Sequence, residues 1–372
     1  MNAYVIRGGG PLRGEVRVGG AKNSALKLVA AALLAPGRSV LRNVPDIADI
    51  AAMAAVVEHL GCRVWRDGDR LTVDVPDEVG DATPAHLVRR LRASIIVLGP
   101  LLARCRRARV ATPGGCNLGS RAIDLHLSGL ARLGAEMSYG TDHVEARAER
   151  LVGADIELPY ASVGATENIL LAAVTAHGTT TVHNAAREPE IGDLATFLSA
   201  MGADIRGAGT SQITVRGVAE LHPAHHTVVG DRIEAGTYAV AAAVTGGSVA
   251  IDGFDPGHLP MVLDKLRAVG AQVDERAGGV TVSADALRAT DVATLPYPGF
   301  PTDLQPQFLL LLTQAAGTSM LTENVFDGRF SIVDELVRLG ADIAVQGHHA
   351  LVRGPRPLRG ARVRAPDLRA GA

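Results

Sequence analysis

Aromatic side chains and cysteine are scarce in this chain of 372 residues. Phe, Trp and Tyr together make up 3% of the sequence, and the only cysteines are Cys62, Cys105 and Cys116. So few aromatic rings do not suit a surface that stacks nucleic-acid bases. An odd number of cysteines without paired spacing predicts free thiols in a reducing compartment.

Excess charge and long apolar runs are also missing. The formal net charge is -2 at pH 7, so the overall balance gives no reason to bind nucleic acid or an anionic membrane. No basic and apolar targeting signal precedes the first strand-like segment, and no apolar run approaches the length of a membrane span. We therefore expect a soluble, cytoplasmic protein in which local arginines bind any anionic ligand.

Lysine is rare as well. Lys22, Lys27 and Lys265 either occupy positions that need a compact ammonium or remain by chance.

The most regular feature of the sequence is a repeat that occurs five times. Each copy runs from an apolar stretch to a turn, a β-like segment and an amphipathic stretch that closes on a hydrophobic residue and a glycine. Four of the five turns contain a glycine. The closing glycines are 73, 68, 68 and 70 residues apart, and they are Gly61, Gly134, Gly202, Gly270 and Gly340. The chain ends where we expect a sixth copy to begin.

Each copy has the pattern of a β-α-β-β unit preceded by a very apolar helix, such as Leu170–Ala176. A helix that is apolar all round must be buried on every side. We therefore expect α/β units arranged inside out, with the helices at the centre and the sheets outside.

The length of the chain is too great for one ordinary core and predicts two domains. The segment His222–Thr227 combines Pro with polar residues, which indicates a solvated linker rather than a metal site. We expect a domain of three copies over residues 22–229. The second domain would join residues 1–21 to 230–372 and be incomplete at its C-terminus. Two N-terminal strands outside the repeat would contribute to it, Ala3–Arg7 and Gly14–Val18.

A glycine-rich turn with a lysine, Gly19–Ser24, opens the first apolar helix. Its backbone N–H groups, the helix dipole and the Lys22 ammonium favour an anion there, although Asn23 or Ser24 capping an ordinary helix fits equally well. Arg92 enters the apolar helix Ile95–Leu102, where it either holds a phosphate or lies on the surface.

The second copy replaces its turn with the loop Pro113–Arg121. Three glycines let the backbone approach a ligand, and the Arg121 charge can lower the pKa of the Cys116 thiol. A buried structural role suits Cys62 and Cys105 better than a cysteine in such a loop. We therefore predict a catalytic role for Cys116.

Other polar residues stand just ahead of apolar helices, so each fits a helix cap as well as a ligand contact. These are Asp124 in Asp124-Leu125-His126, Ser162 in Ser162-Val163-Gly164, and Asp303. For His126 a position in the core is as good an alternative to a ligand contact. Asp231–Thr237 opens the fourth copy with dense charge. Burial beside Phe308–Leu312 can tune Asp303 as a base. Asp367–Arg369 lies in what we expect to be a frayed tail.

Taken together, these segments resemble the enolpyruvyl transferase family. The resemblance rests on Gly-Ala-Lys-Asn at 20–23, Leu-Arg-Ala-Ser at 91–94, Pro-Gly-Gly-Cys at 113–116, Asp-Leu-His at 124–126, Ser-Val-Gly-Ala-Thr at 162–166, Asn-Ala-Ala-Arg-Glu-Pro-Glu at 184–190, Asp-Arg-Ile-Glu at 231–234 and Phe-Pro-Thr-Asp at 300–303. It implies a two-domain inside-out α/β barrel of repeated β-α-β-α-β-β units, with five complete units present and the sixth missing.

The resemblance also implies a reaction. The enolpyruvyl group of phosphoenolpyruvate passes to the 3-hydroxyl of UDP-N-acetylglucosamine and phosphate is released, as the first committed step of peptidoglycan synthesis. No cofactor and no metal are implied. By the same resemblance Cys116 is the general acid and the target of fosfomycin, Asp303 is the partner of the attacking hydroxyl, and Lys22 and Arg121 surround phosphoenolpyruvate. The implied substrate-binding residues are Lys22, Asn23, Arg92, Arg121, Ala122, Ile123, Asp124, Leu125, Ser162, Val163, Gly164, Asp303, Val325 and Arg369.

Two other functions stay open at this point. A sister enzyme that accepts shikimate 3-phosphate shares the fold and the cosubstrate, although the cysteine loop argues against it. A non-catalytic paralogue or fragment would bind the nucleotide sugar without turnover, as the missing sixth copy suggests. The sequence does not specify an oligomeric state.

Overall fold

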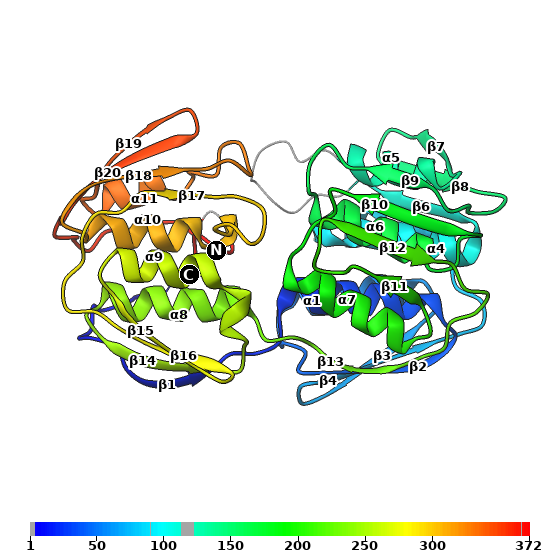
Figure 1. The fold of residues 1–372 in the computed structure, drawn as a ribbon, viewed down its shortest axis with the longest axis horizontal. Helices are drawn as coiled ribbons and strands as arrows, with labels where there is room; N and C mark the ends of the chain where they lie inside the picture. The colour runs from blue at the N-terminus through cyan, green and yellow to red at the C-terminus, as the bar shows by residue number, and fades with distance from the viewer. Residues whose placement is uncertain (1–3, 90, 113–122, 366) are drawn as a thin grey trace. The chain divides into compact units, whose positions relative to one another are not determined.

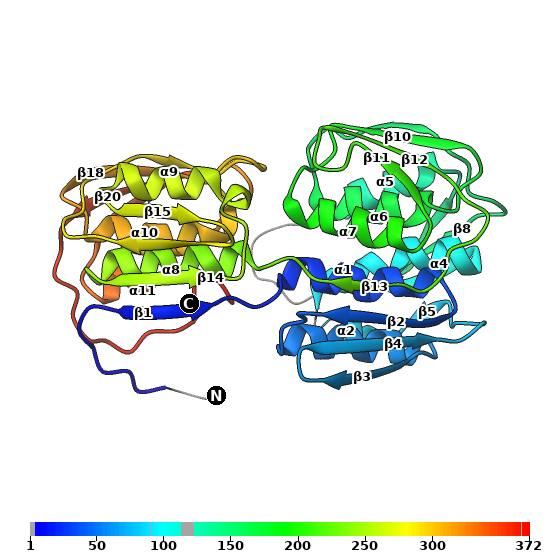
Figure 2. The ribbon, with the colours of Figure 1, turned by 60° about the horizontal axis from the view of Figure 1, so that its bottom comes forward.

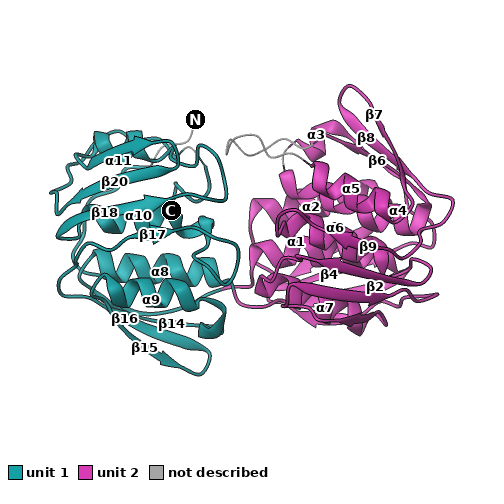
Figure 3. Cartoon of the chain, turned by 45° about the horizontal axis from the view of Figure 1, so that its top comes forward, with its two compact units in different colours: residues 1–18, 231–372 teal, residues 19–230 magenta. Residues whose placement is uncertain are grey.

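The computed structural model describes residues 4–89, 91–112, 123–365 and 367–372. The chain divides into two compact units, with residues 1–18 and 231–372 in unit 1 and residues 19–230 in unit 2 (Figure 3). None of the helices in the described ranges combines the length and the apolar character that crossing a bilayer needs.

Unit 2 holds twelve of the strands in the described residues and the first seven helices. Its strands are β2 (Gly37–Arg42), β3 (Arg63–Asp67), β4 (Arg70–Val75), β5 (Ala82–Thr83), β6 (Arg107–Ala111), β7 (Glu136–Tyr139), β8 (His143–Arg147), β9 (Asp155–Glu157), β10 (Thr179–His183), β11 (Asp204–Arg206), β12 (Gln212–Arg216) and β13 (His225–Thr227). Its helices are α1 (Lys22–Ala31), α2 (Ala48–His59), α3 (Ala85–Val88), α4 (Leu98–Cys105), α5 (Asp124–Arg132), α6 (Val163–Ala173) and α7 (Pro189–Ala200), with the 3-10 turns η1 (Ala32–Leu34) and η2 (Arg92–Val97).

Unit 1 contains the remaining elements of the described chain. Its strands are β1 (Arg13–Arg17), β14 (Ser248–Asp252), β15 (Gln272–Arg276), β16 (Gly279–Ser283), β17 (Val292–Ala293), β18 (Gly317–Thr322), β19 (Asp342–Gln346) and β20 (His349–Gly354). Its helices are α8 (Arg232–Val244), α9 (Pro260–Ala268), α10 (Gln305–Thr313) and α11 (Val333–Arg338), with the 3-10 turns η3 (Pro256–His258) and η4 (Thr302–Leu304).

The described strands form five four-stranded sheets that share one plan (Figure 1). In each sheet a parallel edge strand is followed by three strands that pair antiparallel. The orders are β13-β2-β4-β3, β5-β6-β8-β7 and β9-β10-β12-β11 in unit 2, and β1-β14-β16-β15 and β17-β18-β20-β19 in unit 1. This regularity confirms the predicted set of five β-α-β-α-β-β repeats.

The helices of each unit lie between its sheets (Figure 1). Most residues of the first helix of each copy are buried. Every residue of α6 from Ala165 to Ala173 is buried, although three of them are polar. α6 packs against α4, α5 and α7, and α1 packs against α2 and α7. The expected core of helices with sheets outside is therefore confirmed.

The first strands of two copies are exchanged between the units. β1 precedes α1 in the chain, yet it pairs in parallel with β14 of unit 1 (Figure 2). β13 precedes α8, yet it pairs in parallel with β2 of unit 2. The chain therefore passes between the units twice. The two passing segments meet where Gly20 bridges Gly230 and the Ala21 N–H donates to the Val229 carbonyl at 2.7 Å.

Two local predictions are wrong. His222–Thr227 is not a solvated linker, because residues 225–227 form β13 and His226 Nε2 lies 2.7 Å from Asp193 Oδ1 of α7. Residues 4–7 form no strand, and the side chains of Tyr4 and Ile6 are exposed. Whether either segment forms a strand depends on a pairing partner that is distant in the sequence.

The closing glycine of each copy ends its second helix. All five have φ between 93° and 105°, in the left-handed region that favours glycine. In every copy the N–H of the following residue donates to the carbonyl five positions earlier, as from Cys62 to Val57 and from Ala203 to Leu198. This is the Schellman cap, so a hydrophobic residue and a glycine recur because each helix ends in the same way.

Gly20→Ala is expected to destabilise unit 2 where Gly20 bridges Gly230. A Cβ at Gly20 would lie 1.7 Å from the Asn43 carbonyl oxygen, so the backbone itself must shift. The expected loss is about 2–3 kcal/mol, measured by urea unfolding. Gly9→Ala is the matched control, because nothing lies within 4 Å of its added Cβ. Equal unfolding midpoints for the two variants would contradict the prediction.

Candidate active site

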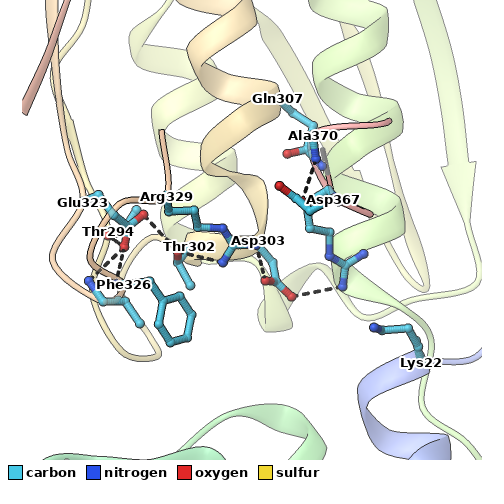
Figure 4. A network of polar contacts seen from close by, with 12 residues as sticks. Lys22, Thr294, Thr302, Asp303, Gln307, Glu323, Phe326, Arg329, Asp367 and Ala370 are labelled. Atoms are coloured by element: carbon cyan, nitrogen blue, oxygen red, sulfur yellow. Dashed lines mark hydrogen bonds and ion pairs between the residues drawn. The ribbon is translucent and has the colours of Figure 1, made fainter. Parts of the chain in front are cut away.

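Two arginines hold the carboxylate of Asp303, which lies in the turn η4 just ahead of α10 (Figure 4). Arg329 Nη2 donates to Asp303 Oδ1 at 2.9 Å, and Arg369 Nη2 donates to Oδ2 at 3.0 Å. Hydrogen bonds between two charged groups are strong, so the pair of guanidinium groups stabilises the ionised carboxylate. The structure thus brings together two predicted site residues, Asp303 and Arg369, and Asp303 does not cap α10.

Arg369 is anchored, so the expectation of a frayed tail is wrong. Burial by itself lowers the pKa of Arg369, but the charges of Asp303 and Asp231 raise it above its ordinary value. The local backbone is fixed by Asp367, whose Oδ1 accepts from the N–H groups of Arg369 and Ala370 at 2.9 and 3.1 Å. The tail is ordered because its arginine has a partner 66 residues earlier in the chain.

Three side chains behind Asp303 form a continuous polar network that the sequence patterns did not reveal. Arg329 is 2% exposed, and its Nη1 donates to Thr302 Oγ1 at 2.9 Å. Thr302 Oγ1 in turn donates to Oε2 of Glu323, which is 1% exposed, at 2.9 Å. A buried arginine and a buried glutamate are therefore linked through one hydroxyl group.

The same glutamate holds the segment that contains the predicted contact residue Val325. Glu323 Oε1 accepts from the backbone N–H groups of Val325 and Phe326 at 2.8 and 3.0 Å, and from Thr294 Oγ1 at 2.8 Å. The network thus positions Asp303 and Val325 together. The sequence could have pointed to Glu323 only through its position two residues before the predicted contact residue Val325. It gave no indication of Arg329, because that residue lies in a turn without a periodic pattern.

In unit 2, Lys22 is the first residue of α1, and its Nζ donates to Asp49 Oδ2 at 3.0 Å. Neither Asn23 nor Ser24 caps this helix, because α1 begins after Ala21 without a side-chain cap. Ser24 Oγ donates instead to Asp193 Oδ2. The alternative of an ordinary capped helix start is therefore wrong for α1.

Arg92 and the start of α6 lie around His126 of α5. A Cβ on Gly164 would lie 2.7 Å from His126 Cε1, so the imidazole ring packs against the first turn of α6. Burial, followed by the charges of Arg92 and Lys27, lowers the pKa of His126 to about 4. Arg92 begins the turn η2, which leads into α4, so the apolar helix predicted at 95–102 is part 3-10 and part α.

Ser162 caps α6, since its Oγ accepts from the Ala165 N–H at 3.3 Å. The prediction that Ser162 caps a helix is thus correct. Val163 and Gly164 are the first two residues of that helix. Asp124 begins α5 and is exposed, directly after Ile123 and before Leu125.

Three predicted residues, Cys116, Arg121 and Ala122, lie outside the described residues. The other two cysteines, Cys62 and Cys105, are free thiols. Burial raises the pKa of Cys62 to about 11 and also raises the pKa of Cys105. Both thiols are therefore poor nucleophiles and poor acids near neutral pH.

A buried ion pair joins the two central helices α1 and α6. Glu167 is fully buried, and its Oε1 and Oε2 lie 3.1 and 3.0 Å from Lys27 Nζ. Burial raises the pKa of Glu167 to about 7, the Lys27 charge opposes this shift, and Glu190 and Glu188 add to it.

Glu167→Gln is expected to remove a fall in stability that the wild type shows between pH 5 and pH 8. The pKa of Glu167 in the folded state lies above its ordinary value of 4.5, so its contribution to stability is complete below pH 4.5 and is lost as the pH rises through 7. Relative to the variant, the wild-type free energy of unfolding should fall by about 2–3 kcal/mol between pH 5 and pH 8. Urea unfolding at several pH values measures this difference. Glu58→Gln on the exposed face of α2 is the control and should follow the wild type. Parallel curves for wild type and Glu167→Gln would contradict the prediction.

The chain is similar along its length to known transferases. Residues 6–372 match the family described as EPSP synthase (3-phosphoshikimate 1-carboxyvinyltransferase). UDP-N-acetylglucosamine 1-carboxyvinyltransferase of Mycobacterium bovis is 53% identical over 370 residues, which cover 99% of this chain and 88% of the relative. The protein of the same name from Corynebacterium jeikeium is 52% identical over 372 residues, which cover 100% of this chain and 89% of the relative.

Solved structures have the same fold. The enolpyruvyl transferase NikO from Streptomyces tendae superposes with a TM-score of 0.90 at 31% identity, over 98% of this chain and 88% of that chain. EPSP synthase from Acinetobacter baumannii superposes with a TM-score of 0.68 at 19% identity, over 94% of this chain and 83% of that chain, and supports the fold alone. The chain described here belongs to the enolpyruvyl transferase family.

Proposed function

We propose that this chain transfers the enolpyruvyl group of phosphoenolpyruvate to the 3-hydroxyl of UDP-N-acetylglucosamine in the cytoplasm, as a step of peptidoglycan synthesis. The observation that carries the proposal is 53% identity, over 99% of the chain, to a relative named UDP-N-acetylglucosamine 1-carboxyvinyltransferase. A shikimate 3-phosphate acceptor has less support, because the solved EPSP synthase structure is only 19% identical.

In the proposed reaction the sugar 3-hydroxyl oxygen attacks C2 of phosphoenolpyruvate and passes its proton to Asp303, while C3 gains a proton from Cys116, which gives a tetrahedral intermediate. A C3 proton then returns to the Cys116 thiolate as phosphate leaves C2 and takes up the proton held by Asp303, which yields the enolpyruvyl ether. We assign Cys116 as the acid that protonates C3. Asp303 accepts the hydrogen bond of the attacking hydroxyl, because each carboxylate oxygen retains acceptor capacity beside its arginine.

Negative charge accumulates as phosphate leaves, so cations near phosphoenolpyruvate stabilise the transition state. We assign this role to Lys22, Arg121 and Arg369. The remaining substrate contacts in the proposal hold the nucleotide sugar, and they are Asn23, Arg92, Ala122, Ile123, Asp124, Leu125, Ser162, Val163, Gly164 and Val325. We propose that the chain forms two domains. One covers residues 22–229, and the other joins residues 1–21 to residues 230–372.

Cys116→Ala is expected to lower phosphate release from phosphoenolpyruvate and UDP-N-acetylglucosamine by roughly 10²–10⁴-fold, because the general acid is lost. Cys105→Ala is the matched control, since it removes a free thiol whose pKa is raised. Inorganic phosphate is measured for both variants and for the wild type.

The acceptor is tested in the same assay. Wild-type activity with shikimate 3-phosphate but not with UDP-N-acetylglucosamine would reassign the substrate. Tight binding of UDP-N-acetylglucosamine without any phosphate release would make the chain a binding protein and contradict the proposed reaction.

A further inference from the structure

Asp193 of α7 is a buried carboxylate that accepts from three donors on three segments of unit 2. Its side chain is 8% exposed. Oδ2 accepts from Ser24 Oγ of α1, and from the Val229 N–H at 3.3 Å. Oδ1 lies 2.7 Å from His226 Nε2 of β13. An ionised carboxylate only accepts hydrogen bonds, so His226 Nε2 carries the proton in this contact.

The three donors lie near the two ends of unit 2, which covers residues 19–230. Ser24 is the third residue of α1, and Val229 stands one residue before the end of the unit. The two ends also meet through the backbone, where the Ala21 N–H donates to the Val229 carbonyl at 2.7 Å. One buried carboxylate therefore fixes the start of α1 against the last segment of the unit.

The hydroxyl of Ser24 connects this carboxylate to the first turn of α1. The helix begins after Ala21 without a side-chain cap, and Ser24 is fully buried. A buried hydroxyl needs a partner within the protein, and Asp193 supplies it. Because the helix has 3.6 residues per turn, Lys22 and Asn23 lie in the same turn as Ser24. A shift of Ser24 would therefore move both of these predicted site residues.

β13 holds the carboxylate from its other oxygen. α1 and β13 both pack against α7 (Figure 2). The ring of His226 lies beside Phe197 of α7, with the ring centres 5.7 Å apart, and residues 225–227 pair in parallel with β2. The Asp193 side chain thus cannot rotate away from Ser24 without breaking its bond to His226.

We propose that Asp193 is a positioning residue for the enolpyruvyl transfer, because it holds the first turn of α1, and with it Lys22, in the place that the reaction requires. The inference rests on the proposed function, in which Lys22 stabilises the charge on phosphoenolpyruvate. A displacement of about 1 Å at a reacting group can cost roughly 10²-fold in rate.

Asp193→Leu replaces the carboxylate by an apolar group with the same branching. It should lower kcat/KM for phosphoenolpyruvate roughly 10–100-fold, measured as phosphate release with saturating UDP-N-acetylglucosamine. The affinity for UDP, measured by calorimetry, should stay within about threefold of the wild type, because many of the proposed nucleotide-sugar contacts lie on α5 and α6. Normal binding of UDP also shows that the variant is folded.

Ser24→Ala tests the connection to α1 in a chain that keeps the carboxylate. It should lower kcat/KM for phosphoenolpyruvate at least about fivefold. Ser39→Ala is the matched control, because Ser39 is also buried in unit 2 but its Oγ accepts from the Ala224 N–H at 3.3 Å and does not bond to α1. This control should keep the wild-type kcat/KM.

Asp193→Asn separates position from charge. The amide oxygen can accept from Ser24 and Val229, and the amide NH₂ can donate to His226 once the neutral ring carries its proton on Nδ1. Asp193→Asn should therefore stay within about fivefold of the wild-type kcat/KM. An equal loss in Asp193→Asn and Asp193→Leu would show that the charge acts directly and would overturn the positioning role.

The two proposals fail in different ways. If the wild type releases no phosphate with UDP-N-acetylglucosamine, the proposed function is wrong, and this inference with it. If the wild type is active and Ser24→Ala and Asp193→Leu keep its kcat/KM, only the positioning role of Asp193 is wrong. If Ser39→Ala loses as much activity as Ser24→Ala, the loss reflects general destabilisation of unit 2, which also overturns the positioning role.

Discussion

Asp303→Asn is expected to lower the turnover number of the proposed transfer by roughly 10²–10⁴-fold, the range typical for loss of a group that handles a proton. Both carboxylate oxygens accept from arginines, at 2.9 and 3.0 Å. An asparagine must turn its NH₂ toward one of these guanidinium groups, so donor faces donor and the side chain loses its charge. Phosphate release under saturating substrates measures the effect, while the affinity for the nucleotide sugar should change much less.

Asp342 offers a matched control in the same unit. It also lies between two arginines, Arg353 and Arg356, at 3.2 and 3.1 Å, but on the surface strand β19. Asp342→Asn should leave turnover unchanged. If Asp303→Asn kept a turnover number within about fivefold of the wild type, a role of Asp303 in handling the hydroxyl proton would be wrong.

Arg329→Met is expected to lower the free energy of unfolding by about 3–5 kcal/mol, because removing one member of a buried ion pair leaves the other without full compensation. Arg329 is 2% exposed, bonds to Thr302 and Asp303, and lies with its guanidinium carbon 5.6 Å from the centre of the Phe326 ring. Turnover should fall as well, since Asp303 loses one of the two groups that position it. Urea unfolding and phosphate release are measured on the same preparation.

Arg338→Met is the control for this variant. Arg338 pairs with Glu335 at 3.3 Å on the surface of α11, where such a pair contributes at most about 1 kcal/mol. In a double-mutant cycle, Arg329→Met combined with Asp303→Asn should be less destabilised than the sum of the single changes, with a coupling of about 0.5–3 kcal/mol. Strict additivity would show that the two side chains do not interact energetically.

Sequence motifs predicted Asp303 and Arg369 but not the residues that hold Asp303 in place. Asp303 stands beside an apolar helix in a recognisable segment, and Arg369 follows from the family resemblance. Arg329 carries no such signal, and Glu323 only its place two residues before Val325, because their importance comes from burial and from the bonds that both make to Thr302. Burial of a charge depends on what packs over it, and local sequence does not encode that.

The contacts of His126 also could not be predicted from the local sequence. The sequence left it open whether this histidine was a core residue or a ligand contact. The structure shows that its ring is held by Asn168, 42 residues away. The Asn168 amide is itself held by the Gly99 N–H and the Ile95 carbonyl.

The sequence by itself determined the repeated unit, because a helix that must be buried and a glycine that must end it with positive φ leave a fixed period in the chain. It also determined that the first helix of each copy lies inside its unit. Only the tertiary structure decided that β1 and β13 exchange places, that His226 lies in a strand, and that Arg369 is anchored on Asp303. The physical reason is that local patterns record the needs of one segment, whereas strand pairing and ion pairing depend on which other segment satisfies them.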